Sequence, residues 1–149
     1  VMGLDGDRKM SKSLGNHIAL TDDSETIWKK IAPAKTDIRR KRRSDPGVPE
    51  DCNIFSWHKF FSSEEEIAWA DEGCRSAGIG CRDCKQVVAK NIDAELAPMR
   101  ERRAELEAHP GRLDEILREG TRKLRPIGRD TMLETREKLG IPGKERYES

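Results

Sequence analysis

The chain has 149 residues, of which 34% are hydrophobic and 38% charged, with three Trp, three Phe and one Tyr. This size and balance fit one domain with a lean core and favour solvent-exposed helices over a β-sandwich. The net charge of +1 predicts no polyanion partner from total charge alone. No apolar run approaches the roughly 18 residues that span a bilayer, and no export leader is seen. We therefore expect a cytoplasmic protein with no membrane partner.

The first third of the sequence predicts a loop, a short helix and a turn. Residues 1–16 carry three glycines among acidic and amide side chains, which favours a loop. Residues 22–32 begin with capping side chains, and Ile27 and Ile31 fall on one helical face. Residues 45–49, Asp-Pro-Gly-Val-Pro, predict a turn.

The remainder predicts three helical stretches. Ser63 and Glu66 form a capping box that starts a short helix, and Gly73 is placed to end it. A long helix begins near Cys84, and another follows a turn at residues 109–111 and is capped by Gly140. Pro98 and Pro126 predict kinks or breaks in these long helices. The inward-facing residues expected of the last helix are Leu113, Ile116, Leu117, Leu124, Ile127, Leu133 and Leu139.

A short turn between two long helices favours antiparallel packing. We therefore predict a mainly α fold, in which an antiparallel helical bundle carries a catalytic loop at its N-terminal edge.

The opening loop has the equipment to bind a polyphosphate. Lys9 and Lys12 are three residues apart, so both ammonium groups can reach one side of a tight loop, and Ser11 and Ser13 add hydroxyl groups. Neighbouring glycines let backbone N–H groups approach an anion closely. If ATP is attacked at its α-phosphate, such lysines can meet the charge that builds on the departing pyrophosphate. A solvated loop with incidental lysines is the alternative.

The literal string Lys9-Met10-Ser11-Lys12-Ser13 resembles the second signature of class I aminoacyl-tRNA synthetases. The surrounding residues are similar to the tryptophanyl-tRNA synthetase family over nearly the whole chain. The matching stretches are Gly3-Leu4-Asp5-Gly6, residues 31–37 (Ile-Ala-Pro-Ala-Lys-Thr-Asp), residues 45–55, residues 80–85, and the pattern from Leu113 to Gly120 and on to Gly140.

This resemblance implies an enzyme that activates tryptophan with ATP, taken as its Mg complex, and transfers it to tRNA(Trp). The chain would be the C-terminal part of that enzyme. Residues 1–20 would be the edge of the catalytic domain and residues 21–149 a helical anticodon-binding domain. Lys12 would contact the ATP phosphates, Lys9 and Ser11 would support it, and Met10 and Ser13 would close the loop over the nucleotide.

The family's first signature, Rossmann domain and tryptophan pocket have no counterpart in these residues. We therefore expect the isolated chain to be inactive. The resemblance also implies that the full-length enzyme is a homodimer. The alternatives are a non-catalytic, metal-stabilised RNA-binding module, and another class I synthetase such as the tyrosyl enzyme.

Four cysteines form a candidate metal site with the spacing C-x21-C-x6-C-x2-C: Cys52, Cys74, Cys81 and Cys84. The spacing alone leaves free thiols or a disulfide, a structural zinc and a [4Fe–4S] cluster open. The resemblance favours the cluster, because some tryptophanyl-tRNA synthetases carry one at matching cysteines.

An unbroken basic run follows the first predicted helix: Arg39, Arg40, Lys41, Arg42 and Arg43. Runs of this kind contact phosphates without reading sequence, so tRNA-backbone contact is the functional hypothesis, with a solvated turn as the alternative. We expect Trp28, Trp57 and Trp69 to pack rather than stack on bases, and the three histidines to have surface or capping roles.

Overall fold

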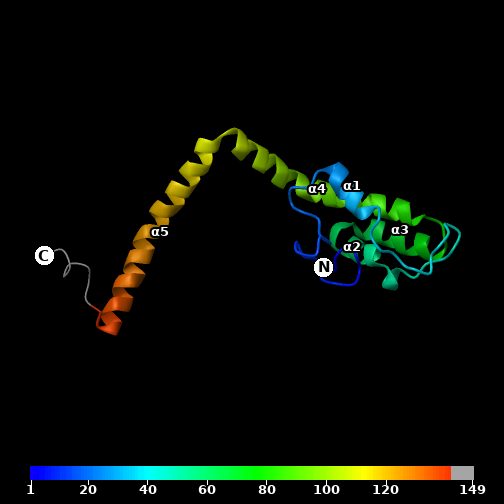
Figure 1. Cartoon of the computed structure of the whole chain (residues 1–149), viewed down its shortest axis with the longest axis horizontal. Helices are drawn as coiled ribbons and strands as arrows, with labels where there is room; N and C mark the ends of the chain where they lie inside the picture. The colour runs from blue at the N-terminus through cyan, green and yellow to red at the C-terminus, as the bar shows by residue number, and fades with distance from the viewer. Residues whose placement is uncertain (142–149) are drawn as a thin grey trace. The chain divides into compact units, whose positions relative to one another are not determined.

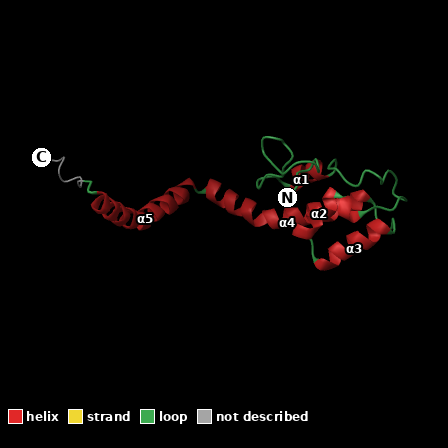
Figure 2. Ribbon diagram, turned by 90° about the horizontal axis from the view of Figure 1, so that it is seen from below, coloured by secondary structure: helices red, strands yellow, loops and turns green. Residues whose placement is uncertain are grey.

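The computed structural model describes residues 1–141, which are helical apart from loops and turns (Figures 1 and 2). Within these residues no strand is formed, and the β-type pairing is limited to an isolated antiparallel bridge between Met2 and Lys9. The prediction of a mainly α fold is confirmed. The elements in chain order are α1 (Ser24–Ile31), the 3-10 helix η1 (Pro49–Asp51), α2 (Asn53–Phe61), α3 (Glu64–Arg75), α4 (Cys81–Ala108) and α5 (Pro110–Leu139).

The described chain divides into two compact units, with the boundary inside α4. The first unit runs from Val1 to Arg102 and the second begins at Arg103. The first unit holds the core, to which α1, α2, α3 and the first half of α4 contribute. Because the opening loop belongs to this unit, it rests on a helical base. The predicted division at residue 20 stays a prediction, and residues 142–149 lie outside the described residues.

Helix ends that depend on local capping follow the sequence prediction. The Asp23 side chain caps α1 by accepting from the Thr26 N–H at 2.8 Å, and Ile27 and Ile31 are fully buried on its inner face. Ser63 and Glu66 form the predicted capping box of α3. Gly140 closes α5 with a φ of 65°, in the left-handed region where glycine has no Cβ penalty.

Gly73 does not end α3, because the helix continues to Arg75. Its role is close packing: a Cβ at this position would meet the Ile79 side chain at 2.8 Å. Helices η1 and α2 were not predicted. Helix α2 supplies three fully buried side chains, Ile54, Trp57 and His58.

The prediction for the last helix is wrong in one respect. Helix α5 forms over nearly the predicted residues and continues through Pro126, but it buries none of its side chains within the described chain. Leu117, Leu124 and Ile127, which were predicted to face inward, are about 60% exposed or more. An apolar stripe is buried only where another surface covers it. The predicted antiparallel packing is accordingly not confirmed.

Within residues 1–141 no helix combines the length and the apolar character needed to cross a membrane.

Candidate functional site: a lysine loop on a helical base

The opening loop is organised around Asn16, which is only 5% exposed. Its Nδ2 donates to Asp5 Oδ2 at 2.9 Å and to the Lys9 carbonyl at 3.4 Å. Its Oδ1 accepts from the Ser11 N–H at 2.8 Å, and its backbone carbonyl accepts from Leu4 at 2.9 Å. One buried amide therefore links both sides of the loop and fixes the segment from Lys9 to Ser11.

Two turns of this loop need residues that accept a positive φ. Gly6 has a φ of 68° and Gly15 a φ of 66°, a region that costs other residues steric strain. Gly3 has a different constraint, because a Cβ there would lie 2.2 Å from Asn16 Nδ2. The glycines thus allow the tight path of the loop around Asn16.

Lys9 and Lys12 are both exposed, on a segment whose backbone is fixed. No ion pair ties down either ammonium group within residues 1–141. Between them, Ser11 Oγ and Ser13 Oγ lie 2.9 Å apart. The loop therefore presents two free cations and two hydroxyl groups to solvent, which is the arrangement an approaching polyphosphate requires.

Three long-range hydrogen bonds hold the root of the loop on the helical base. The Trp57 indole N–H donates to the Met2 carbonyl at 3.1 Å, and Asn53 Nδ2 donates to the Gly3 carbonyl at 2.8 Å. Lys35 Nζ contacts Asp7 Oδ1 at 2.5 Å. Trp57 and Asn53 lie on α2, so this helix positions the loop.

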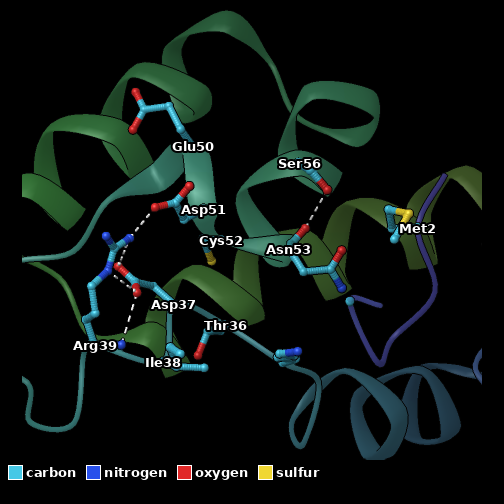
Figure 3. Close-up of a pocket in the computed structure, with 12 residues that line it drawn as sticks. Met2, Thr36, Asp37, Ile38, Arg39, Glu50, Asp51, Cys52, Asn53 and Ser56 are labelled. Carbon is cyan, nitrogen blue, oxygen red and sulfur yellow. Dashed lines mark hydrogen bonds and ion pairs between the residues drawn. The ribbon is translucent and has the colours of Figure 1, made fainter. Parts of the chain in front are cut away.

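A cavity of about 550 Å³ lies beside the root of the loop (Figure 3). Its lining joins the loop to the start of the basic run and to α2, with Met2, Arg39 and Asn53 as representatives. On its wall Arg39 is held between two carboxylates: Nε lies 2.9 Å from Asp37 Oδ1 and Nη2 lies 2.5 Å from Asp51 Oδ2. The cavity is therefore lined by charges that already compensate one another.

Most of the basic run is used inside the protein. Besides Arg39, Arg40 donates to Cys74 Sγ at 3.6 Å and to the carbonyls of Arg43 and Ile79. Arg43 pairs with Asp83 at 3.2 Å. Lys41 and Arg42 are exposed, and among the described residues neither side chain has an ion pair. Phosphate contact by the five-residue run stays a prediction, and Lys41 and Arg42 are its exposed members without an ion pair in the described chain.

Asp37 gives this region a testable pH dependence. Its hydrogen bonds from the Arg39 side chain, and then from the backbone N–H groups of Val48 and Arg39, lower the pKa of the carboxyl group from 3.8 to about 2. The folded state therefore favours the ionised form. The stabilisation, about 2 kcal/mol, should be complete above pH 4 and be lost as the pH falls toward 2.

We expect Asp37→Asn to lower the free energy of unfolding by about 2 kcal/mol at pH 7 and by much less at pH 2. Urea unfolding followed by tryptophan fluorescence measures this. The matched control is Asp114→Asn, at an exposed carboxyl on α5, which should change little at either pH. A loss for Asp37→Asn that is equal at pH 7 and pH 2 would contradict the assignment.

The four cysteines come together without forming a metal centre in the described chain. All four are free, and Cys52 and Cys84 are buried. Burial raises the pKa of the Cys84 thiol to about 12, and the charges of the other three cysteines add to this shift. Within residues 1–141 no three His, Cys, Asp or Glu side chains are arranged to hold one metal ion. The predicted metal site is accordingly not confirmed.

His58 is a feature of the cysteine region that the sequence did not reveal. It was expected to have a surface or capping role, but it is fully buried. Its Nε2 lies 3.1 Å from Cys84 Sγ and its Nδ1 lies 2.8 Å from Ser62 Oγ. Burial lowers the pKa of His58, which favours the neutral ring. Trp57 is packed as predicted, whereas Trp69 is 38% exposed.

Comparison with known proteins identifies the family. Residues 1–97 match the family described as tRNA synthetases class I (W and Y). The chain belongs to the class I tRNA synthetases. Among curated relatives of this family, the chain is 42% identical to a tryptophan–tRNA ligase of Aquifex aeolicus and 43% identical to one of Deinococcus radiodurans, in each case over 95% of its own length.

A solved structure supports the same synthetase fold. The tryptophanyl-tRNA synthetase from Campylobacter jejuni, complexed with ADP and tryptophan, matches 93% of this chain with a TM-score of 0.81 and 33% sequence identity. The chain spans 36% and 43% of the lengths of the two curated relatives and 42% of this structure. The matched region therefore represents less than half of such an enzyme.

Proposed function

We propose that the chain is the part of a tryptophan–tRNA ligase that carries its ATP-phosphate loop and a tRNA-binding helical region. The observation that carries the proposal is the Asn16-centred loop, which leaves Lys9 and Lys12 exposed on a fixed backbone. The names of the relatives support tryptophan as the amino acid. The assignment to the C-terminal part of such an enzyme, and its cytoplasmic location and homodimeric state, stay predictions.

The proposed chemistry is activation of the amino acid. A carboxylate oxygen of tryptophan attacks the α-phosphorus of Mg-bound ATP, and the bond to the bridging oxygen breaks. Pyrophosphate departs with the bonding electrons, leaving tryptophanyl-AMP, whose acyl group then passes to the 3′ end of tRNA(Trp). Lys12 meets the charge that grows on the leaving phosphates, and Lys9 with Ser11 supports it. Met10 and Ser13 complete the loop over the nucleotide. Cations positioned before the reaction lower the barrier because they need no reorganisation when charge develops.

We also propose that the basic run contacts phosphates, chiefly through Lys41 and Arg42. Arg39, Arg40 and Arg43 are committed to contacts within the chain. Lys41 and Arg42 are the members available to a tRNA backbone, where each would add a non-sequence-specific contact.

We also propose that the four cysteines hold a [4Fe–4S] cluster with a structural role. Four cysteine thiolates are the ligand set of such a cluster, and these four sulfurs lie within electrostatic range of one another. Arg40 at 3.6 Å from Cys74 Sγ and His58 at 3.1 Å from Cys84 Sγ could both donate to ligating sulfurs. A single zinc ion held by the same four thiolates is the alternative.

Metal analysis tests the cluster independently of activity. Anaerobically purified protein should be brown, with broad visible absorption and about four irons per chain. Cys52→Ser and Cys81→Ser should lose the colour, and Ser56→Ala on α2 should keep it. Colourless protein with one zinc, or with no metal, would exclude the cluster.

Amino-acid-dependent exchange of pyrophosphate into ATP tests the activity. The full-length protein should catalyse exchange with tryptophan, and the isolated 149-residue chain should not. Exchange with tyrosine in place of tryptophan would indicate a tyrosyl-tRNA synthetase. Exchange with neither amino acid would favour a non-catalytic RNA-binding module.

A further inference from the structure

Helix α5 carries a row of arginines whose charge is not neutralised within the described chain. Arg118, Arg122, Arg125 and Arg129 follow the spacing i, i+4, i+7 and i+11, which places them on one helical face. All four are exposed. We call these four residues the arginine stripe.

Two acidic side chains beside the stripe are paired with other cations. Glu115 pairs with Arg112 at 3.0 Å and Glu119 with Lys123 at 2.9 Å. Within the stripe, Arg129 has a neighbour in Asp130 at 3.2 Å. No ion pair involving Arg118, Arg122 or Arg125 is formed within residues 1–141. The stripe therefore presents at least three uncompensated guanidinium groups.

The stripe borders a groove along α5. This groove of about 550 Å³ is lined by Arg118, Arg122, Arg125 and Arg129, together with Leu117, Thr121 and Pro126. Pro126 lies inside the helix and has no N–H to donate to the Arg122 carbonyl four residues earlier.

The apolar residues of α5 occupy a different face. Leu113, Leu124 and Ile127 follow the spacing i, i+11 and i+14, which turns them away from the stripe, and Leu117 lies at the border between the two faces. A surface that covers this apolar face therefore leaves the arginines in solvent. The helix has one face suited to burial and another suited to a charged partner.

We propose that the arginine stripe binds the phosphate backbone of RNA. Successive arginines stand about 4.5 to 6 Å apart along the axis and the row spans about 16 Å, so several phosphates of one strand can be met together. Every member is arginine, whose planar guanidinium forks onto phosphate oxygens, and such contacts fix register without reading sequence. Within the proposed function, on which the choice of RNA rests, the RNA is the tRNA substrate.

The test is tRNA binding by the 149-residue chain as a function of salt. The variant Arg118→Gln/Arg122→Gln/Arg125→Gln should bind tRNA(Trp) about ten-fold or more weakly at low salt. The slope of log affinity against log salt should shrink by about 2 to 3, because each lost phosphate contact removes somewhat less than one unit. The variant Arg118→Lys/Arg122→Lys/Arg125→Lys keeps the positive charges and should keep the slope. Circular dichroism checks that both variants retain their helix, so that a lost slope can be assigned to lost charge.

A matched control is available on the same helix. Arg112→Gln/Lys123→Gln/Lys138→Gln removes the same net charge from exposed positions that pair with Glu115, Glu119 and Glu134. Its salt slope should stay near that of the unmodified chain. An unchanged slope for the stripe variant, or an equal loss in the control, would overturn the proposal. So would poly-glutamate or anionic vesicles that displace RNA as effectively as a second RNA does.

The same titration separates this proposal from the proposed function. An equal effect of the stripe variant on tRNA(Trp) and on an unrelated tRNA supports backbone contact. A different outcome is that the unmodified chain binds both RNAs equally well while the stripe variant binds both more weakly. That result supports phosphate contact by the stripe and contradicts selection of tRNA(Trp) by this chain.

Discussion

Replacing Lys12 with Ala in the full-length enzyme is expected to lower the turnover of tryptophan-dependent ATP–pyrophosphate exchange by about 10²- to 10³-fold. The ammonium group stands exposed on a backbone that Asn16 fixes, so it meets the leaving phosphates without reorganisation. Lys9→Ala should act in the same direction. Because the interaction strengthens as charge develops, the loss should fall on kcat more than on the KM for ATP.

Lys29→Ala is the matched control for this pair. Lys29 is an exposed lysine on α1 that pairs with Glu25 at 2.6 Å, and its loss should leave exchange unchanged. A rise in the KM for ATP at constant kcat in Lys9→Ala and Lys12→Ala would mean that the lysines bind ATP and its transition state equally. That result would contradict their proposed role.

Asn16→Ala is expected to lower exchange by about 10²-fold although Asn16 need not touch ATP. The substitution leaves the Ser11 N–H, the Asp5 carboxylate and the Lys9 carbonyl without their partner. The loop should relax, and both lysines would then lose their fixed position. Asn16→Asp should be no better, because it sets a second carboxylate against Asp5.

Asn16→Ala should lower the exchange activity strongly and the thermal stability only slightly. The core of the first unit lies in the helices, so the thermal midpoint should move only a few degrees. Leu20→Ala, at an exposed position just past the loop, is the control and should change neither quantity. Full exchange activity in Asn16→Ala would show that the loop does not depend on this amide.

The sequence predicted best what short-range capping and spacing decide. Asp23 caps a donor three residues away, Ser63 and Glu66 cap each other, and Gly140 ends α5 through its own φ. The literal string from Lys9 to Ser13 likewise carried the family assignment, because the whole motif lies within one loop. These features could be read because each depends on residues within a turn or two of one another.

The sequence did not reveal what distant partners decide. Asn16 acts through Asp5, eleven residues earlier, and Trp57 through Met2, 55 residues earlier. Arg40 donates to the Ile79 carbonyl, so a run that reads as a uniform basic patch contains arginines with internal partners. Histidine is a polar residue that was expected here at the surface. His58 is buried because it lies on helix α2, which was not predicted.

Helix α5 illustrates the limit of periodicity. Its apolar spacing predicted an amphipathic helix correctly, yet periodicity identifies only which residues share a face. It does not identify the surface that covers them, and the described chain leaves that face exposed. The same spacing places the arginine stripe and the apolar residues on different faces, so the stripe can be assigned to a charged partner.

Single-turnover kinetics of the full-length enzyme tests the central role of the lysine loop most directly. Formation of tryptophanyl-AMP and transfer of its acyl group to tRNA(Trp) would be timed separately in the unmodified enzyme, Lys12→Ala and Lys29→Ala. Lys12→Ala should slow adenylate formation by about 10²-fold or more and leave transfer from preformed adenylate close to normal, while Lys29→Ala changes neither. Adenylate formation at the unmodified rate in Lys12→Ala would contradict the account.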